Sequence, residues 1–242
     1  MDERSGRDRT LQELARAPLC AGLGPADLAR LLAAGHPLAP RNRESLFSRG
    51  DPAEAAYLLL GGDGWVEVGA ANRGAKQILV EVFRAGDLFG EMGALDGSPR
   101  SADAEVHGTP RLLVLPAPAF RRALRETPGL GFNLSLLLAA RLRRTFTLLR
   151  DAAFESLEVR LARQLLYLAA QGTVRGPAGL RLARRLNQQQ MADLLGATSR
   201  SIITILNGWR ERGIVAYDGV KGWLTLTDEA ALRGLIATGE EG

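Results

Sequence analysis

The chain of 242 residues has a formal net charge of +4 and is 46% hydrophobic, which suffices for one large or two modest domains with buried cores. Its single cysteine, Cys20, excludes a disulfide framework, a cysteine-ligated iron–sulfur cluster and a structural zinc site. No apolar run is long enough to span a bilayer, and the charged N-terminus lacks a signal-peptide core. We therefore expect no membrane partner and a reducing, cytoplasmic location.

Charge is distributed unevenly along the chain. From Arg160 to Lys221 there are ten Lys/Arg residues against three acidic ones, a balance of +7, which leaves −3 for the rest. A basic C-terminal third on a slightly acidic body is typical of a nucleic-acid-binding module attached to another domain. Without a supporting motif, the same charges would indicate only a solvated basic face.

The N-terminal half predicts short helices followed by strands. Residues 11–35 fit one or two amphipathic helices, with Pro25 in a first turn. From about Leu46 to Pro116, short aliphatic or β-branched runs alternate with glycine turns, which predicts a small antiparallel barrel or sandwich. The runs are residues 57–60, 65–68, 78–83 and 111–115, and the turns lie at Gly61-Gly62, Gly74, Gly86-Asp87 and Gly97. A helix is expected over residues 116–127.

A long helix is predicted over residues 131–154, which hold no proline and no glycine after the first position. Apolar or small residues recur there at spacings of 4, 3, 4 and 3, namely Leu138, Leu142, Thr145, Leu149 and Ala152. This pattern predicts a coiled-coil-like seam of about two heptads. A second apolar stripe comprises Leu134, Leu137 and Leu148. The helix could simply pack on its own domain, but two stripes favour a symmetric homodimer, with one face inward and the other on a partner.

The C-terminal third predicts a winged helix. A helix over residues 157–170 and a Gly/Pro linker over 172–179 precede two short helices that meet at Gly196. A hairpin of residues 214–217 with 223–227 follows, then a last helix over 228–237 capped by Asp228. The second short helix begins with small polar and basic side chains, which can reach base edges and phosphates in the major groove.

Three motifs, taken in their order and spacing, carry a family resemblance. They are Gly86–Leu95 followed by Pro99–Ala102, the long helix with Arg141-Leu142 and Thr145, and the helix-turn-helix of residues 188–206. Over roughly residues 11–227 the chain resembles the Crp/Fnr family of bacterial transcription regulators. The resemblance implies an α+β fold: an N-terminal antiparallel β-roll of the cyclic-nucleotide-binding type, a long dimerisation helix and a C-terminal winged helix-turn-helix.

The resemblance also implies a domain organisation and a function. We expect an effector-binding β-roll domain at 11–130, a dimerisation helix and hinge at 131–154, and a DNA-binding domain at 155–242. Such a protein is a sequence-specific transcription regulator rather than an enzyme. It binds a palindromic operator in double-stranded DNA as a homodimer and contacts RNA polymerase. No cofactor is required, and cyclic AMP is the expected effector.

The first motif predicts the ligand site. Arg100 supplies a forked, charge-assisted contact to the cyclic phosphate, and Ser101 adds a hydroxyl or backbone donor. Glu91 accepts from the ribose 2′-hydroxyl, and its neighbours in the motif are Gly90, which lets the backbone approach the sugar, and Met92. By resemblance, Thr145 reaches the adenine from the dimer helix. Phe146 stands where a serine is frequent, which leaves base selectivity open.

Two alternatives to this ligand site remain. The motif could be a structural turn in which Arg100 pairs with Glu91 or Asp103 and no ligand binds. The protein would then be a regulator of the same fold that responds to another effector or binds DNA constitutively.

The second short helix predicts the DNA-reading side chains. Ile202, Ile205, Leu206 and Trp209 fall on its inward face at helical spacing, while the outward-facing residues are Ser199, Arg200, Ile203, Thr204 and Asn207. Arg200 suits guanine O6 and N7, and the methyls of Ile203 and Thr204 suit thymine. Thr198 and Ser201 fit capping or phosphate contact. Further DNA contacts are expected from Gln188 and Lys221, and phosphate contacts also from Arg181, Arg184 and Arg185.

No catalytic or metal site is predicted. Gly61-Gly62-Asp63 is similar to the start of a cyclase signature but lacks its second acid, and a hairpin turn explains it better. The only histidines, His36 and His107, have no partners for a triad or a metal site beyond Glu105, which would share a strand face with His107. A role for either histidine, such as axial haem ligation, stays open.

Overall fold

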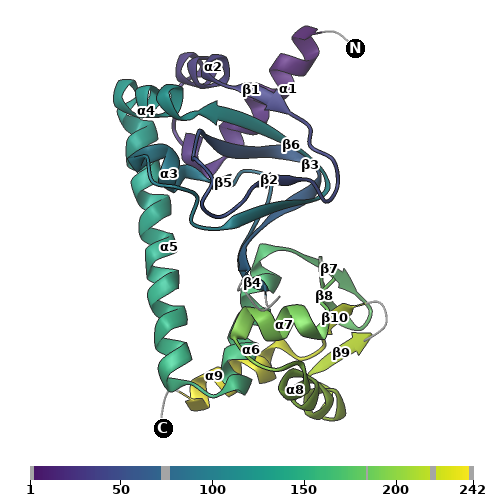
Figure 1. Ribbon diagram of the computed structural model, residues 1–242. Coiled ribbons are helices and arrows are strands. Elements are labelled where there is room, and N and C mark those ends of the chain that lie inside the picture. The colour runs from purple at the N-terminus through teal and green to yellow at the C-terminus, as the bar shows by residue number, and fades with distance from the viewer. Residues whose placement is uncertain (1–2, 72–76, 184, 219–221, 240–242) are drawn as a thin grey trace. The chain divides into compact units, whose positions relative to one another are not determined.

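The computed structural model describes residues 3–71, 77–183, 185–218 and 222–239 (Figure 1). Contacts divide the chain into two units, the first formed chiefly by residues up to Arg143 and the second by Arg144–Gly242. Each unit buries its own hydrophobic cluster. Within the described residues, no helix combines the length and apolar character needed to cross a bilayer.

An antiparallel β-roll forms the centre of the first unit. Its strands are β1 (His36–Leu38), β2 (Ser45–Phe47), β3 (Ala55–Ala71), β4 (Gln77–Phe83), β5 (Leu88–Phe89) and β6 (Asp103–Pro116). The strand order is β1-β6-β3-β4, while β2 pairs with β6 and β5 pairs with β3. The longest ladder joins β3 and β6 and runs from Ala55↔Pro116 to Gly69↔Asp103. The predicted antiparallel β-roll is therefore confirmed.

The predicted turn at Gly61-Gly62 is wrong, because β3 continues through it. Gly62 pairs with Pro110, and a register shift between Leu59 and Gly61 absorbs the irregularity. A Cβ at Gly62 would lie 2.4 Å from the carbonyl oxygen of Thr109. The glycine therefore allows two strands to approach closely within a bulged ladder rather than ending a strand. The turn predicted at Gly74 lies outside the described residues.

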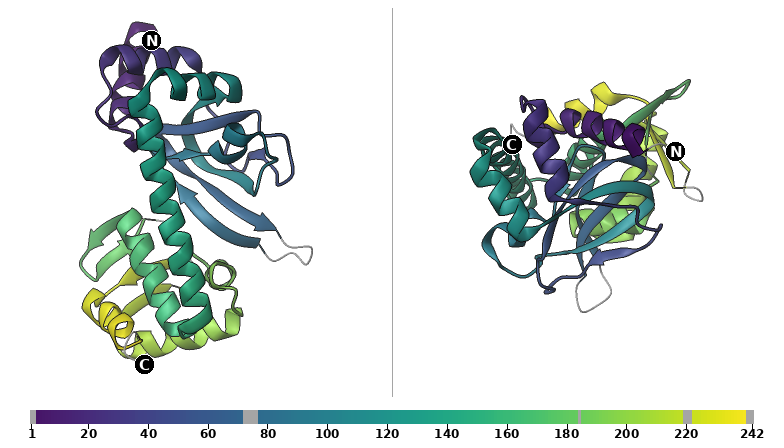
Figure 2. Two further views of the ribbon diagram at one scale, coloured as in Figure 1. Left: turned by 90° about the vertical axis from the view of Figure 1, so that its left-hand side faces the viewer. Right: turned by 90° about the horizontal axis from the view of Figure 1, so that it is seen from above.

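Helices cover one end of this sheet (Figure 2). They are α1 (Glu3–Arg16), the 3-10 turn η1 (Pro18–Cys20), α2 (Pro25–Ala34) and α4 (Ala117–Glu126), while α3 (Glu91–Asp96) follows β5. The helices predicted within residues 11–35 and 116–127 are confirmed, although the first begins earlier, at Glu3. Apolar residues of these helices and of the sheet share one buried cluster, which includes Leu14, Leu31, Leu58, Leu113 and Phe120. Burial of each such side chain stabilises the fold by about 1.5–3 kcal/mol.

The long helix α5 (Pro128–Phe154) begins three residues before its predicted start. Its early apolar residues Leu134, Leu137 and Leu138 pack into the core of the first unit, so Leu138 joins the inward stripe. Leu148 does not follow that stripe and is 40% exposed. Further large apolar side chains are more than half exposed, namely Phe132, Leu136, Leu142, Phe146, Leu149 and Phe154. So much apolar surface along one helix is unusual for a monomer.

The second unit is a winged helix-turn-helix. Its elements are α6 (Leu157–Gln171), β7 (Thr173–Gly176), β8 (Gly179–Leu182), α7 (Gln188–Leu195), α8 (Ser199–Glu211), β9 (Val215–Asp218), β10 (Trp223–Leu226) and α9 (Glu229–Gly239). The sheet order is β7-β8-β10-β9. Ile202, Leu206 and Trp209 are buried as predicted, and Ile205 packs against the same cluster. The Asp228 carboxylate caps α9 by accepting from Ala231 N at 2.9 Å, also as predicted.

The Gly/Pro linker predicted over residues 172–179 is wrong. These residues contribute to a hairpin in which Val174 pairs with Arg181, and β8 in turn pairs with β10. Gly179 has a φ of +125°, and a Cβ there would lie 2.2 Å from the carbonyl oxygen of Leu226. One of the two partners of β8, β10, lies far along the chain, and local composition cannot reveal that pairing.

Candidate ligand site and DNA interface

The turn between β5 and α3 brings Gly90 against Arg100. Gly90 caps α3 in the left-handed conformation, with φ 68° and ψ 14°. A Cβ at this position would lie 2.8 Å from Nη1 of Arg100. The left-handed φ and the close approach of the Arg100 guanidinium both favour glycine here, and the second of these is not indicated by the sequence alone.

Arg100 is buried in a bed of aromatic rings and carbonyl groups. Nη1 donates to the carbonyl oxygen of Gly90 at 2.6 Å and Nη2 to that of Ala55 at 2.7 Å. The guanidinium carbon lies 4.1 Å from the ring centroid of Phe47 and 5.5 Å from that of Tyr57. Burial lowers the pKa of Arg100 below its ordinary value. These hydrogen bonds go to backbone carbonyls rather than to a carboxylate.

The Arg100 guanidinium has donor capacity left for an anion. A guanidinium carries N–H donors on all three nitrogens in a planar fork. The Nε of Arg100 is buried and has no hydrogen-bond partner among the described residues. An unsatisfied buried donor costs about 1–3 kcal/mol, and a phosphate oxygen that reached this nitrogen would offset the cost. The side chain therefore fits a phosphate anion.

Arg141 orients Glu91. Arg141 belongs to the long-helix motif, but the sequence predicts no role for it. The Glu91 side chain is buried, and its Oε1 accepts from Nη1 of Arg141 at 2.7 Å. Arg141 also donates to the carbonyl oxygen of Leu88, and its guanidinium lies 4.9 Å from the ring centroid of Phe83. The sequence feature that could have pointed to Arg141 is its spacing from Thr145, because the two residues lie one turn apart on the same face of α5.

The remaining predicted ligand residues are at the surface. Met92 is 59% exposed, and Ser101 is exposed as well. They directly follow the buried Glu91 and Arg100 in sequence. Thr145 is exposed and belongs to the second unit.

The second helix of the helix-turn-helix, α8, begins with the predicted cap. The Thr198 hydroxyl accepts from Ser201 N at 3.2 Å and shares a hydrogen bond with the Ser201 hydroxyl at 2.9 Å. Along the helix, Arg200, Thr204 and Asn207 are exposed and Ser199 and Ile203 are half-buried, as is Gln188 at the start of α7. Lys221 and Arg184, both predicted to contact DNA, lie outside the described residues.

Two arginines converge on Trp223 at the start of β10, in the wing (the β9–β10 hairpin) of the second unit. The guanidinium carbons of Arg181 and Arg185 lie 4.6 and 5.0 Å from the ring centroid of Trp223. Both side chains are exposed. Cation–π contacts to one ring hold two positive charges close together, an arrangement that suits the DNA backbone.

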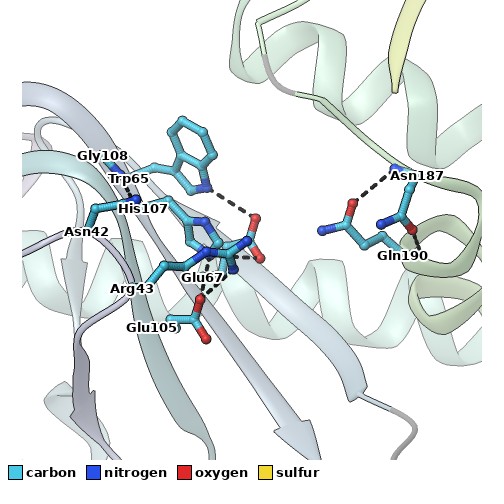
Figure 3. Close-up of polar contacts among 9 residues, drawn as sticks. All are labelled: Asn42, Arg43, Trp65, Glu67, Glu105, His107, Gly108, Asn187 and Gln190. Carbon is cyan, nitrogen blue, oxygen red and sulfur yellow. Dashed lines mark hydrogen bonds and ion pairs between the residues drawn. The ribbon is translucent and has the colours of Figure 1, made fainter. Parts of the chain in front are cut away.

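The histidine on β6 lies in a polar cluster (Figure 3). The ring of His107 stacks on Trp65 at 5.3 Å, and Nε2 lies 3.3 Å from Glu67 and 3.5 Å from Glu105. Arg43 also pairs with Glu105, at 2.6 Å. In the described part of the chain, no group of three or more His, Cys, Asp or Glu residues is arranged to hold a metal ion. Figure 3 also draws the cap of α7, in which Asn187 and Gln190 exchange hydrogen bonds.

A β-roll whose turn fits a phosphate, together with a winged helix-turn-helix, is the combination found in DNA-binding regulators that carry an effector domain. Family models agree, because the cyclic nucleotide-binding domain matches residues 41–127 and the Crp-like helix-turn-helix domain matches residues 159–235. The chain belongs to the Crp/Fnr family of transcription regulators, which is not a class of enzymes.

Individual relatives support this assignment. A cyclic AMP receptor protein from Thermus thermophilus is 30% identical over 82% of this chain and 88% of its own length. A CRP-like cAMP-activated global transcriptional regulator from Mycobacterium tuberculosis is 29% identical over 91% of this chain and 97% of its own. The solved catabolite activator protein of Thermus thermophilus aligns at TM-score 0.53 with 27% identity, covering 92% of this chain and 99% of its own. The c-di-GMP-responsive regulator CLP of Xanthomonas campestris shares the fold at TM-score 0.72 and 21% identity, over 85% of this chain and 100% of its own.

Proposed function

We propose that cyclic AMP binds at the turn around Arg100 and switches the affinity of a homodimer for a palindromic operator. The observation that carries this proposal is the buried Arg100 guanidinium, whose Nε lacks a hydrogen-bond partner among the described residues. The buried Glu91 carboxylate, oriented by Arg141, adds an acceptor suited to a ribose hydroxyl. A cyclic phosphate joined to a ribose matches both groups at once.

The choice of cyclic AMP rests on the long helix and on the relatives. By the family resemblance, Thr145, which follows Arg141 by one helical turn on α5, is the residue expected to offer a hydroxyl to the adenine. Two of the relatives are named for cyclic AMP. Phe146 offers a ring but no hydroxyl beside Thr145, and CLP is named for c-di-GMP, so nucleotide identity is the property to test.

Isothermal titration calorimetry of the nucleotide-free full chain tests the ligand. Cyclic AMP, cyclic GMP and c-di-GMP are titrated in turn into wild type and Arg100→Ala. We expect saturable binding of cyclic AMP at a single site per subunit, weakened about tenfold to a hundredfold in Arg100→Ala because a hydrogen bond to a charged group is lost. Arg125→Ala removes an equal charge from the exposed end of α4 and serves as the control. Absence of binding by all three nucleotides would leave a regulator of this fold that uses another effector or none.

The exposed apolar residues of α5 support the homodimer. Leu142, Phe146 and Leu149 are each more than half exposed and recur at helical spacing, as a partner helix requires. We expect Leu149→Asp to convert the dimer to a monomer, measured by size-exclusion chromatography with light scattering. Thr147→Asp introduces the same charge two residues away, on another face of the helix, and should leave the dimer intact. A monomeric wild type would refute this arrangement.

The proposed switch acts through the spacing of two recognition helices. They must lie about 34 Å apart, one turn of DNA, to bind a palindrome. Cyclic AMP shifts the equilibrium only if its affinity differs between the DNA-binding and the inactive arrangement. Fluorescence anisotropy with a selected operator, with and without cyclic AMP, tests this step, and equal operator affinity would refute it. Contact with RNA polymerase, which the family resemblance suggests, is tested by in vitro transcription from the same operator.

A further inference from the structure

We propose that Ser199 presents only acceptor lone pairs to DNA and so selects a base with an exocyclic amino group, cytosine or adenine, in each half-site. The inference rests on the proposed binding of α8 to DNA and specifies what one of its residues reads. Its basis is a chain of side-chain hydrogen bonds that joins α7 to α8. Gln189 Nε2 donates to Asp193 Oδ1 at 2.7 Å, and the Ser199 hydroxyl donates to Gln189 Oε1 at 2.6 Å.

The direction of each hydrogen bond follows from the chemistry of Asp193. An ionised carboxylate can only accept, so the Gln189 amide must turn its NH2 group toward Asp193. The amide oxygen of Gln189 then faces Ser199. Because an amide oxygen also only accepts, the single hydroxyl proton of Ser199 is committed to Gln189. What remains on Ser199 Oγ is its lone pairs.

An acceptor at the start of α8 discriminates between bases in the major groove. Cytosine N4 and adenine N6 carry hydrogens there, whereas guanine O6 and N7 and thymine O4 are acceptors. A lone pair of Ser199 placed against one of those acceptors would be repelled and left unsatisfied. Ser199 occupies the first position of α8 and is half-buried, next to the exposed Arg200.

A second hydroxyl on α8 has its proton committed in the same way. Thr204 Oγ1 donates to the carbonyl oxygen of Arg200 at 3.1 Å, so Thr204 offers its methyl and lone pairs outward. Arg200 then supplies the hydrogen-bond donors among these three residues. The half-site should therefore combine a guanine for Arg200 with a cytosine or adenine for Ser199.

Operator selection from randomised palindromic DNA tests this inference with the full chain, with and without cyclic AMP. Wild type, Ser199→Ala and Gln189→Leu are compared, and Glu211→Gln, at the far end of α8, is a control. We expect wild type to favour cytosine or adenine about tenfold at one position of each half-site, as for the loss of one hydrogen bond. Ser199→Ala should lose this preference alone. Gln189→Leu should admit guanine and thymine there, because the hydroxyl is released to donate.

The outcomes separate this inference from the proposed function. The inference is overturned, while DNA binding stands, if wild type enriches a palindrome but Ser199→Ala alters the base preference at no position. It is also overturned if the position that responds to Ser199→Ala is guanine or thymine in wild type. An unchanged preference in Gln189→Leu would also overturn it, because the amide would not control the hydroxyl. If wild type enriches no DNA under either condition, the proposed function fails and the inference fails with it. Thermal unfolding of each variant confirms that its fold is retained.

Discussion

Two glycines at opposite ends of α3 allow the strain of a left-handed residue to be separated from the packing of Arg100. Gly90 and Gly97 have φ of 68° and 79°. Alanine in this conformation costs about 1–2 kcal/mol at either position. A Cβ at Gly97 would meet nothing within 4 Å, whereas at Gly90 it would lie 2.8 Å from Nη1 of Arg100 and 3.3 Å from a ring carbon of Phe47. Gly97→Ala is therefore a matched control for Gly90→Ala.

The additional cost at Gly90 comes from the Arg100 side chain. The guanidinium must shift to clear the new methyl group, and we expect this shift to break its 2.6 Å hydrogen bond to the Gly90 carbonyl oxygen. A hydrogen bond to a charged group contributes about 1.5–3 kcal/mol. We therefore expect Gly90→Ala to lower the free energy of unfolding by about 2.5–5 kcal/mol, against about 1–2 kcal/mol for Gly97→Ala.

Calorimetry measures both parts of this prediction. For a chain of this size, each kcal/mol lowers Tm by about 2–4 °C, so differential scanning calorimetry resolves the two variants. We expect Gly90→Ala to weaken cyclic nucleotide binding as well, because Arg100 is displaced, and Gly97→Ala to bind as wild type does. Equal values of Tm and equal nucleotide affinity in the two variants would refute the reasoning.

Three further predictions concern a thiol, a carboxyl group and the wing. Burial raises the pKa of Cys20 to about 12, so Ellman's reagent should label it only after unfolding, and rapid labelling of the folded chain would contradict this. Burial also raises the pKa of Asp87, so the folded chain favours the protonated carboxyl group. The stabilisation that comes from this protonation is fully present below the pKa of an unfolded aspartate, and it is lost as pH rises through the raised pKa of the folded chain. Asp87→Asn should therefore gain stability over wild type in urea unfolding at neutral pH, and a gain that persists at about pH 3 would count against this cause. Arg181→Ala and Arg185→Ala should each reduce the salt slope of operator affinity by about 0.9 without altering base preference, and a change in preference would exclude a pure phosphate role.

The elements that the sequence predicts correctly are those with strong local signals. The second helix of the helix-turn-helix is predicted from the glycine turn at Gly196 and from Ile202, Leu206 and Trp209, which recur at helical spacing and are buried. The last helix is predicted from its Asp228 cap. In each case the period and the cap lie within a few residues of one another, so the information is local.

The elements for which the sequence prediction is wrong depend on strand pairing, much of it with partners far along the chain. Gly61-Gly62 has the composition of a turn, yet it lies inside β3 because β6 pairs with it across a bulge. Residues 172–179 have the composition of a linker, yet most of them form strands because β7 pairs with β8 and β8 with β10. Glycine permits both a turn and a close backbone approach, so composition alone cannot distinguish the two.

The turn between β5 and α3 also combines features that the local sequence reveals with contacts that it does not reveal. Arg100 and Glu91 can be identified from residue type, because an anion and a hydroxyl need a donor and an acceptor at short spacing. What holds each side chain is not visible in the sequence, since Gly90 and Ala55 accept from Arg100 while Arg141 pairs with Glu91 from 50 residues away. Arg141 belongs to the same helix as the exposed apolar residues proposed to meet a second copy. A nucleotide that competed with Arg141 for Glu91 would therefore act on α5 itself, the helix for which a second copy is proposed as partner.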